Sequence, residues 1–240
     1  MSLKKYFRIF NHHGGGLRGF KRCLDTFTQV DFFDYKRFGI NTRENIRDGY
    51  SNTNYMFYAP VYTDVSREMI LLANDYWASA IKYTDYSAQS IFIDLGCGSG
   101  KTLIQAIESK RFNGVYGVEL LKNLSDRCNR NINKVSKNKN FKKPCLNLNV
   151  EDESWCKKLI ENHQSKNTTL FIFNKNSYTG EVIQKTLDIA EKYFSNIFYL
   201  YQNPVASDIL YDKDYKLVIS DSKSSAVHKN YKYSIFLKKV

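Results

Sequence analysis

Residues 91–102, IFIDLGCGSGKT, give the clearest structural pattern in the chain. It opens as an apolar run and continues into a helical pattern from Thr102 to Glu108. Between the two lie an acid and three alternating glycines, namely Asp94, Gly96, Gly98 and Gly100. Glycines at a strand end permit positive φ and a close backbone approach to a ligand, while the N–H groups that start a helix point at a polar group. The stretch therefore predicts a nucleotide-cofactor turn.

The glycine spacing separates three kinds of turn. A phosphate-binding loop needs a glycine, four intervening residues and then Gly-Lys-Ser/Thr, which would place the first glycine at position 95, where the chain has Leu95. A dinucleotide fingerprint needs G-x-G-x-x-G, whereas the chain has G-x-G-x-G with an acid two residues before it. The pattern resembles the first motif of class I S-adenosylmethionine-dependent methyltransferases, an acid followed by x-G-x-G-x-G.

A second strand is expected one helix later, ending in an acid that binds the ribose hydroxyls of the cofactor. Residues Asn113 to Glu119 meet that expectation, and Leu120 follows as a candidate for the adenine face. An ordinary tight loop is the alternative for the glycine turn alone. Glu119 at the expected place makes that alternative much weaker.

The remaining pattern alternates helices and strands. Helices are expected at 66–83, with Ser66 as N-cap, and at 121–135, 151–162 and 181–194; strands are expected at 144–150, 168–174, 196–201, 215–220 and 231–240. This order predicts an α/β fold with a doubly wound, mostly parallel seven-stranded sheet and a late antiparallel pair, the Rossmann-like methyltransferase fold. Residues 1–65 are expected to form a helical N-terminal extension or lid, and residues 66–240 the S-adenosylmethionine-binding domain.

Composition sets the protein class. With 240 residues, no long apolar run and no secretory segment at the start, the chain is expected to be a soluble, cytoplasmic protein without a membrane span. Its five cysteines contain no C-x-x-C pair, so we expect free thiols, no disulfide framework and no metal site.

The formal charge is +12, and much of the excess lies between Lys122 and Lys143. This run would suit an anionic partner such as nucleic acid, a phosphorylated sugar or a membrane surface. A solvated helix and loop is the favoured interpretation, because no aromatic residues interleave with the basic ones as in a base-stacking surface.

Several segments narrow the resemblance. Residues 33–42 (FDYKRFGINT), 58–63 (YAPVYT) and 198–205 (FYLYQNPV) look like a bacterial methyltransferase subgroup distantly similar to the Dot1-type histone-lysine methyltransferases. The first segment carries one additional residue, and Phe173 to Ser177 replaces the Asn-Pro-Phe that the subgroup has after its fourth strand. This departure leaves room for an altered acceptor or for lost activity.

The resemblance implies a set of cofactor residues, with S-adenosylmethionine as the cofactor. They are Asp94, Gly96, Cys97, Gly98 and Gly100 at the methionine end, Glu119 at the ribose, Leu120, Asn149 and Val150 around the adenine, and Tyr58 and Thr63 as a cover. Asn174 is expected to contact the cofactor close to the reacting centre. His228 is a candidate base, although a lone loop histidine is more often solvated. His12 and His13 precede three glycines and could belong to a lid or to a plain connection.

The expected activity is methyl transfer from S-adenosylmethionine to an oxygen or nitrogen atom of a small metabolite or glycan, because no nucleic-acid module is visible. Catalysis of this kind is mainly positioning, since the sulfonium methyl is already a strong electrophile. Two alternatives stay open: a nucleic-acid or protein methyltransferase that uses the basic 122–143 face, and a cofactor-binding protein without catalysis.

Overall fold

The computed structural model describes residues 10–11, 15–17, 19–20, 40–42, 63–82, 88–136, 144–163, 168–176, 178–223 and 231–239. The helices from residue 63 onward are α4 (Thr63–Trp77), the π-helix η1 (Ala78–Lys82), α5 (Lys101–Ser109), α6 (Lys122–Val135), α7 (Ser154–Asn162), α8 (Gly180–Glu191) and α9 (Asp208–Asp212). The strands are β1 (Gln89–Leu95), β2 (Gly114–Glu119), β3 (Cys145–Asn147), β4 (Thr168–Asn174), β5 (Asn196–Gln202), β6 (Lys216–Lys223) and β7 (Tyr231–Lys239). No helix in the described ranges is both long and apolar enough to cross a membrane.

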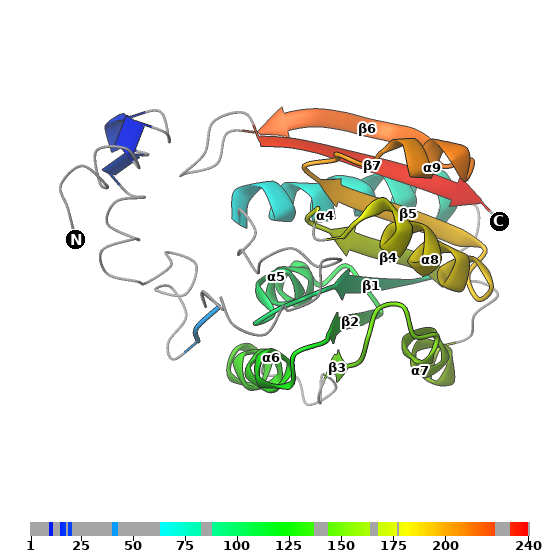
Figure 1. Cartoon of the computed structure of the whole chain (residues 1–240), viewed down its shortest axis with the longest axis horizontal. Coiled ribbons are helices and arrows are strands. Elements are labelled where there is room, and N and C mark those ends of the chain that lie inside the picture. Colours follow the sequence, from blue (N-terminus) through cyan, green and yellow to red (C-terminus); the bar gives the residue numbers. More distant parts are fainter. Residues whose placement is uncertain are drawn as a thin grey trace.

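The seven strands form one sheet in the order β3-β2-β1-β4-β5-β7-β6 (Figure 1). The first five strands are parallel, and β7 pairs antiparallel with both β5 and β6. The predicted α/β fold, with its mostly parallel sheet and late antiparallel pair, is confirmed. The carboxyl ends of the five parallel strands all lie on the same side of the sheet, on the left in Figure 1. This side, called the carboxyl edge below, is where open α/β sheets bind ligands.

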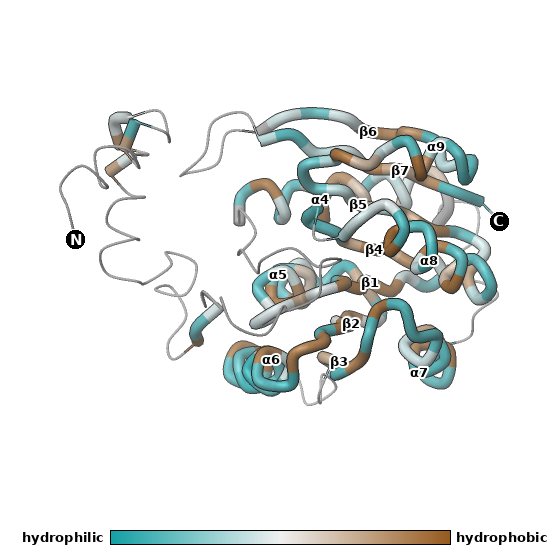
Figure 2. Tube along the Cα trace, in the orientation of Figure 1, coloured by the Kyte–Doolittle hydropathy of each residue, from teal (hydrophilic) through white to brown (hydrophobic). Residues whose placement is uncertain are grey.

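Two apolar layers cover the two faces of the sheet, and strongly apolar residues lie on the strands and on the helices that face them (Figure 2). One layer includes Met69 and Trp77 of α4, Leu103 of α5 and Ile132 of α6. The other includes Trp155 of α7 and Leu187 of α8. Burial on both faces explains why β1 and β4 read as continuous apolar runs rather than alternating ones.

Helix α4 differs from the sequence prediction at both ends. It begins at Thr63 rather than at Ser66, and its α-helical part stops at Trp77, where η1 takes over. Ser66 thus lies inside the helix and is not its N-cap. Its hydroxyl donates to Gln105 Oε1 of α5 at 2.7 Å. At the other end the Trp77 indole donates to Thr169 Oγ1 of β4 at 2.9 Å. These buried tertiary bonds, which the sequence pattern does not display, fix the helix on the sheet.

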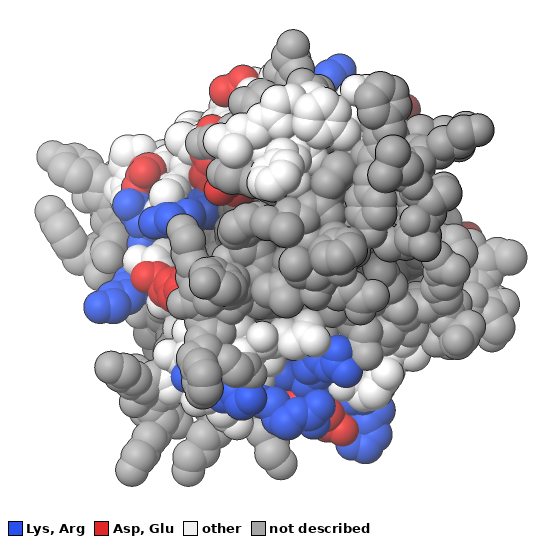
Figure 3. All heavy atoms as spheres, turned by 90° about the vertical axis from the view of Figure 1, so that its left-hand side faces the viewer, with Lys and Arg blue, Asp and Glu red and all other residues white. Residues whose placement is uncertain are grey.

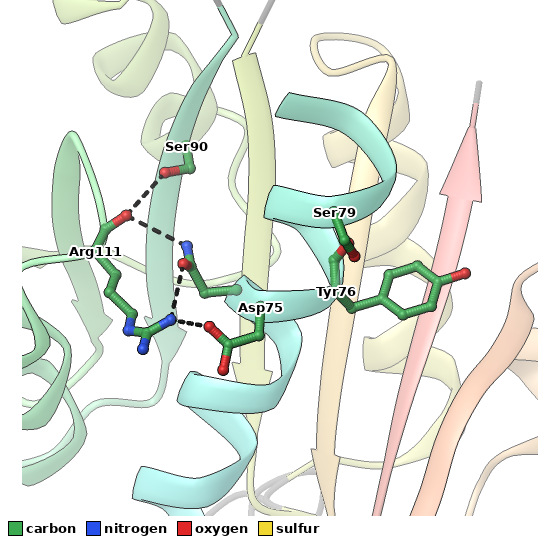
Figure 4. Close-up of polar contacts among 6 residues, drawn as sticks. Asp75, Tyr76, Ser79, Ser90 and Arg111 are labelled. Carbon is green, nitrogen blue, oxygen red and sulfur yellow. Dashed lines mark hydrogen bonds and ion pairs between the residues drawn. The ribbon is translucent and has the colours of Figure 1, made fainter. Parts of the chain in front are cut away.

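A polar cluster fastens α4 to the loop between α5 and β2, at the amino ends of the parallel strands (Figure 4). The Arg111 guanidinium forms an ion pair with Asp75, and the Arg111 carbonyl accepts hydrogen bonds from Asn74 Nδ2 at 3.3 Å and from the Ser90 hydroxyl at 3.4 Å. These contacts hold α4 against the amino ends of the strands, called the amino edge below. The ligand side of such a sheet is the opposite one, at the carboxyl ends.

Other element boundaries also differ from the prediction. The third strand ends at Asn147 rather than at residue 150, because the Asn149 side chain accepts the Glu151 N–H at 3.0 Å and turns the chain. Helix α7 starts at Ser154, whose N–H is accepted by Asp152 Oδ1. Helix α8 ends at Glu191 rather than at residue 194, and α9 was not predicted at all. Most of the expected N-terminal extension lies outside the described residues.

Candidate functional site

The glycine turn joins β1 to α5 at the carboxyl edge of the sheet. Gly96, Gly98 and Gly100 have φ values of 74°, 54° and 88°. The N–H groups of Gly96 and Cys97 both donate to the Val118 carbonyl of β2, at 2.8 and 3.0 Å. A Cβ on Gly96 would lie 2.5 Å from the Tyr178 hydroxyl, so this position requires glycine for space as well as for conformation. Strand, turn and helix follow one another as the sequence indicates.

Glu119 ends β2 directly beside this turn and is only 3% exposed. Its Oε2 accepts the Gly98 N–H and its Oε1 accepts the Leu121 N–H, each at 2.9 Å. Burial raises the pKa of Glu119 to about 7, although these backbone hydrogen bonds oppose the shift. Each carboxylate oxygen can accept a further hydrogen bond, so the group can also receive a pair of hydroxyl donors.

Asp94 is a second buried carboxyl group behind the turn, 5% exposed. Desolvation raises its pKa well above the ordinary aspartate value, a hydrogen bond from Thr102 opposes the shift, and the nearby Glu119 adds to it. No lysine or arginine of the described chain forms an ion pair with Asp94 or Glu119. Two buried acids that form no ion pair with a described lysine or arginine suit a ligand that carries positive charge.

The candidate adenine-side residues occupy different environments. Leu120 is 44% exposed, and Asn147 Nδ2 holds its segment by donating to the carbonyls of Glu119 and Leu120, at 3.0 and 2.8 Å. Asn149 shapes the turn after β3. Val150 is buried in the α7–α8 layer, and its carbonyl accepts the Trp155 indole N–H. Any contact of Val150 with a ligand would therefore involve its backbone rather than its side chain.

Amide and phenol groups line the ends of β4 and β5. Asn174 is fully buried and its Nδ2 donates to the Tyr199 hydroxyl at 2.8 Å. Tyr201 contacts Asn176 Oδ1 at 3.5 Å through its own hydroxyl. Burial raises the pKa of Tyr199 far above its ordinary value, so this phenol stays protonated. Asn174, Tyr199 and Tyr201 are all buried, so these hydrogen bonds order the ends of β4 and β5, and none of the three side chains is a base.

Several residues that the sequence reasoning passed over belong to the same edge. The Tyr178 hydroxyl covers Gly96, and Tyr178 is 7% exposed. Gln202 ends β5 with both side-chain polar atoms buried and without a hydrogen-bond partner. Cys128 and Cys145 meet Cys97 beneath the glycine turn. Tyr178 and Gln202 lie in or beside segments that the sequence pattern had singled out. Cys128 and Cys145 meet Cys97 only through the order of the sheet, so local patterns gave no signal for these two cysteines.

The structure leaves other candidates unplaced. Tyr58, His228, His12 and His13 lie outside the described residues, and Thr63 is described only as the first residue of α4. The four described cysteines Cys97, Cys128, Cys145 and Cys156 are free thiols. The side chain of Cys97 turns toward Cys145 and Gly117, so its part in the turn is played by the backbone.

The cofactor that the sequence resemblance implies fits this site. S-adenosylmethionine carries a sulfonium and an ammonium group, which match the buried acids, and ribose hydroxyls, which match the free acceptor capacity of Glu119. The exposed apolar surface of Leu120 lies next to that acid and suits a base ring.

Comparison with known proteins gives a family match and fold-level likenesses. The family model described as "Histone methylation protein DOT1" matches residues 55–194. A search of curated proteins found no significant match. Among solved structures, magnesium protoporphyrin IX methyltransferase from Synechocystis PCC 6803 with bound S-adenosylmethionine is similar at 11% identity and TM-score 0.49, over 88% of this chain and 97% of that one. A putative RNA methyltransferase from Pyrococcus horikoshii is similar at 15% identity and TM-score 0.49, over 80% and 92%. A ribosomal protein L11 methylase from Lactobacillus delbrueckii subsp. bulgaricus gives 10% identity and TM-score 0.43, over 76% and 88%.

The residues that the family model matches make up more than half of the chain, and they include the glycine turn, Glu119 and β4. The sheet order and the geometry of the turn agree with that match. The chain therefore belongs to the DOT1 methyltransferase family, and it is an S-adenosylmethionine-dependent methyltransferase.

Proposed function

We propose that the protein transfers the methyl group to an oxygen or nitrogen atom of a small metabolite or glycan. The observation that supports this acceptor class is the group of phenols and amides at the ends of β4 and β5, in which Asn174 donates to Tyr199 and Tyr201 contacts Asn176. Aromatic faces and amide groups suit hydroxyl-rich or amine-bearing small molecules. The cytoplasm is the proposed compartment, in keeping with free cysteine thiols.

The proposed roles divide along the sheet edge. The backbone of the glycine turn and Asp94 hold the methionine end, Glu119 accepts the ribose hydroxyls, and Leu120, Asn149 and the Val150 backbone border the adenine. When bound, S-adenosylmethionine supplies an electrophilic methyl group, so the chain's own task is to position the acceptor and exclude water. Asn174 is proposed to orient the acceptor through its amide, which Tyr199 holds in place.

A protein or nucleic-acid acceptor is the second candidate, and the basic surface of α6 favours it. Lys122, Arg127, Arg130 and Lys134 lie on this helix, where Asp126 is the acid that pairs with Lys122. Figure 3 shows blue side chains gathered over the lower part of the face that looks onto the carboxyl edge. The family name also points to a protein acceptor. Such a surface would attract polyanions or an acidic protein.

Calorimetric titration with S-adenosylmethionine and S-adenosylhomocysteine tests the cofactor site. We expect saturable binding that weakens by about 1–3 kcal/mol in Glu119→Ala, because a charge-assisted pair of hydrogen bonds is lost. Glu161→Ala, at an exposed position in α7, is the matched control and should bind like the wild type. Equal binding by wild type and Glu119→Ala would contradict the ribose role of Glu119.

Transfer of a labelled methyl group to fractionated cell extract separates the three functions. Label in the small-molecule fraction, reduced in Asn174→Ala, supports the proposal. Label in protein or polynucleotide, with binding that falls steeply as salt rises and weakens in Lys122→Glu/Arg130→Glu, supports the second candidate. Tight cofactor binding without transfer to any fraction would point to the non-catalytic alternative.

A further inference from the structure

Three cysteines from distant parts of the chain meet beneath the glycine turn. Cys97 lies within the turn, Cys128 lies in α6, and Cys145 begins β3. The Cys97 sulfur is 3.3 Å from that of Cys145 and 4.0 Å from that of Cys128, and all three sulfurs lie within 4.8 Å of one another. All three side chains are buried, at 5% exposure or less.

The surrounding backbone makes room for the sulfurs. A Cβ on Gly117 would lie 2.6 Å from Cys97 Sγ, and a Cβ on Gly100 would lie 2.6 Å from Cys128 Sγ. Glycine at these two positions thus gives the thiols the space that a side chain would fill. The cluster lies between β2, the turn and α6, and each element brings a part of its wall.

The backbone around each cysteine is also fixed by hydrogen bonds. The Cys97 N–H donates to the Val118 carbonyl at 3.0 Å. Asn129 of α6 clamps Cys145 from both sides, since its Oδ1 accepts the Cys145 N–H and its Nδ2 donates to the Cys145 carbonyl, each at 3.1 Å. Ligands held on rigid elements in this way form a preorganised site.

We propose that Cys97, Cys128 and Cys145 form a three-coordinate binding site for a soft monovalent metal ion, Cu(I), behind the cofactor turn. Thiolates select soft ions such as Cu(I). With metal–sulfur distances of about 2.3 Å, a planar three-coordinate ion holds its sulfurs about 4.0 Å apart. The separations of 3.3 and 4.0 Å, with the third no longer than 4.8 Å, require only small shifts to reach that geometry.

The ligand count decides between ions. In the described part of the chain no His, Asp or Glu joins the three sulfurs as a further ligand atom. A structural zinc ion takes four ligands in a tetrahedron, whereas Cu(I) is satisfied with three thiolates in one plane. Binding exchanges the thiol protons for the ion, with no change in the oxidation state of sulfur or copper.

Titration of the whole protein with Cu(I), supplied as its bicinchoninate complex under reducing, oxygen-free conditions, tests the site. The protein carries Cys23→Ser, so that this additional thiol does not contribute. We expect one Cu(I) per chain, removed from the coloured complex, and an affinity at least 100-fold lower in Cys128→Ala. Cys156→Ala is the matched control, because Cys156 is a buried thiol in the opposite apolar layer, and it should bind like the parent.

X-ray absorption of the loaded parent protein gives a measurement that needs no core variant. We expect three sulfur neighbours around copper. In a separate thermal denaturation experiment, the midpoint should rise with Cu(I) in the parent but not in Cys128→Ala. Failure of the parent to compete for Cu(I), a two-sulfur coordination shell, or unchanged affinity in Cys128→Ala would overturn the proposal. None of these readouts depends on methyl transfer, so the result stands apart from the acceptor question.

Discussion

At the scale of single residues, Glu119 connects the structure to cofactor chemistry most directly. Its pKa is raised to about 7 by burial, yet the ionised form is the one that accepts the ribose hydroxyls best. Below pH 7 a proton must leave before binding. We therefore expect the dissociation constant for S-adenosylmethionine to be about tenfold higher at pH 6 than at pH 8. Calorimetry across this range measures it, and Glu119→Gln should show weak binding with little pH dependence. A wild-type slope retained in the variant would assign the proton to another group.

Gln202 is a buried amide, and neither of its two side-chain polar atoms has a hydrogen-bond partner among the described residues. Unpaired buried polar groups cost stability, and an apolar side chain of similar shape removes that cost. We expect Gln202→Met to raise the free energy of unfolding by about 1–2 kcal/mol in urea titration. Gln105→Met is the matched control, because Gln105 accepts the Ser66 hydroxyl and its loss should destabilise. Destabilisation by both substitutions would show that Gln202 is already satisfied in solution.

At the scale of elements, a buried hydrogen bond joins α4 to β4 beside the packing of Trp77 on Phe171. The Trp77 indole donates to Thr169 Oγ1, and both residues are nearly inaccessible. Thr169→Val keeps the shape but leaves the indole N–H unpaired, so we expect a loss of about 1–3 kcal/mol in unfolding free energy. Thr169→Ser keeps the hydroxyl and should lose less. Chemical denaturation followed by tryptophan fluorescence measures both, and equal losses would mean that packing of the threonine methyl, not the hydrogen bond, dominates.

The same element shows how far sequence reasoning reaches. The turn from β1 to α5 and the strand ending at Glu119 were predictable, because glycine spacing and apolar runs are local properties. The ends of α4 were not, since Ser66 is committed to Gln105 of α5 rather than to its own helix. The third strand was overestimated because an Asn149 turn interrupts it. The cysteine cluster could not be found by spacing, because Cys97, Cys128 and Cys145 meet only through the order of the sheet.

At the scale of the whole molecule, the amino and carboxyl edges of the sheet carry different kinds of residues. The amino edge is closed by the Arg111 cluster on α4, whereas the carboxyl edge gathers two buried acids, an unpaired amide and several phenols. Such groups lower stability where they are not satisfied. The apolar layers on both faces of the sheet therefore stabilise an edge whose own residues are arranged for binding.

This arrangement makes the stability of the cofactor-free protein depend on pH through Glu119. The pKa of Glu119 is raised from 4.5 to about 7 in the folded state. Its contribution is therefore fully present below pH 4.5 and is lost as the pH rises through 7, because the folded protein then has to lose a proton that it holds more tightly than the unfolded chain does. Glu119→Gln removes this loss. The variant should gain stability over the wild type between pH 5 and pH 8, by at most about 3 kcal/mol.

Urea titrations of the wild type and Glu119→Gln at pH 5 and pH 8, with and without S-adenosylmethionine, measure this effect. The other titrating groups are present in both proteins, so their contribution cancels in the difference between the two free energies of unfolding. Glu161→Gln, which makes the same replacement at an exposed position of α7, serves as the control variant. Saturating cofactor should narrow the difference at pH 8, since a ligand at 100 times its dissociation constant stabilises the wild type by about 2.7 kcal/mol and the variant, which binds weakly, by less. A variant that is no more stable than the wild type at pH 8 would mean that the Gly98 and Leu121 N–H groups hold the carboxylate ionised, so that the acid is prepared for ribose before the cofactor arrives.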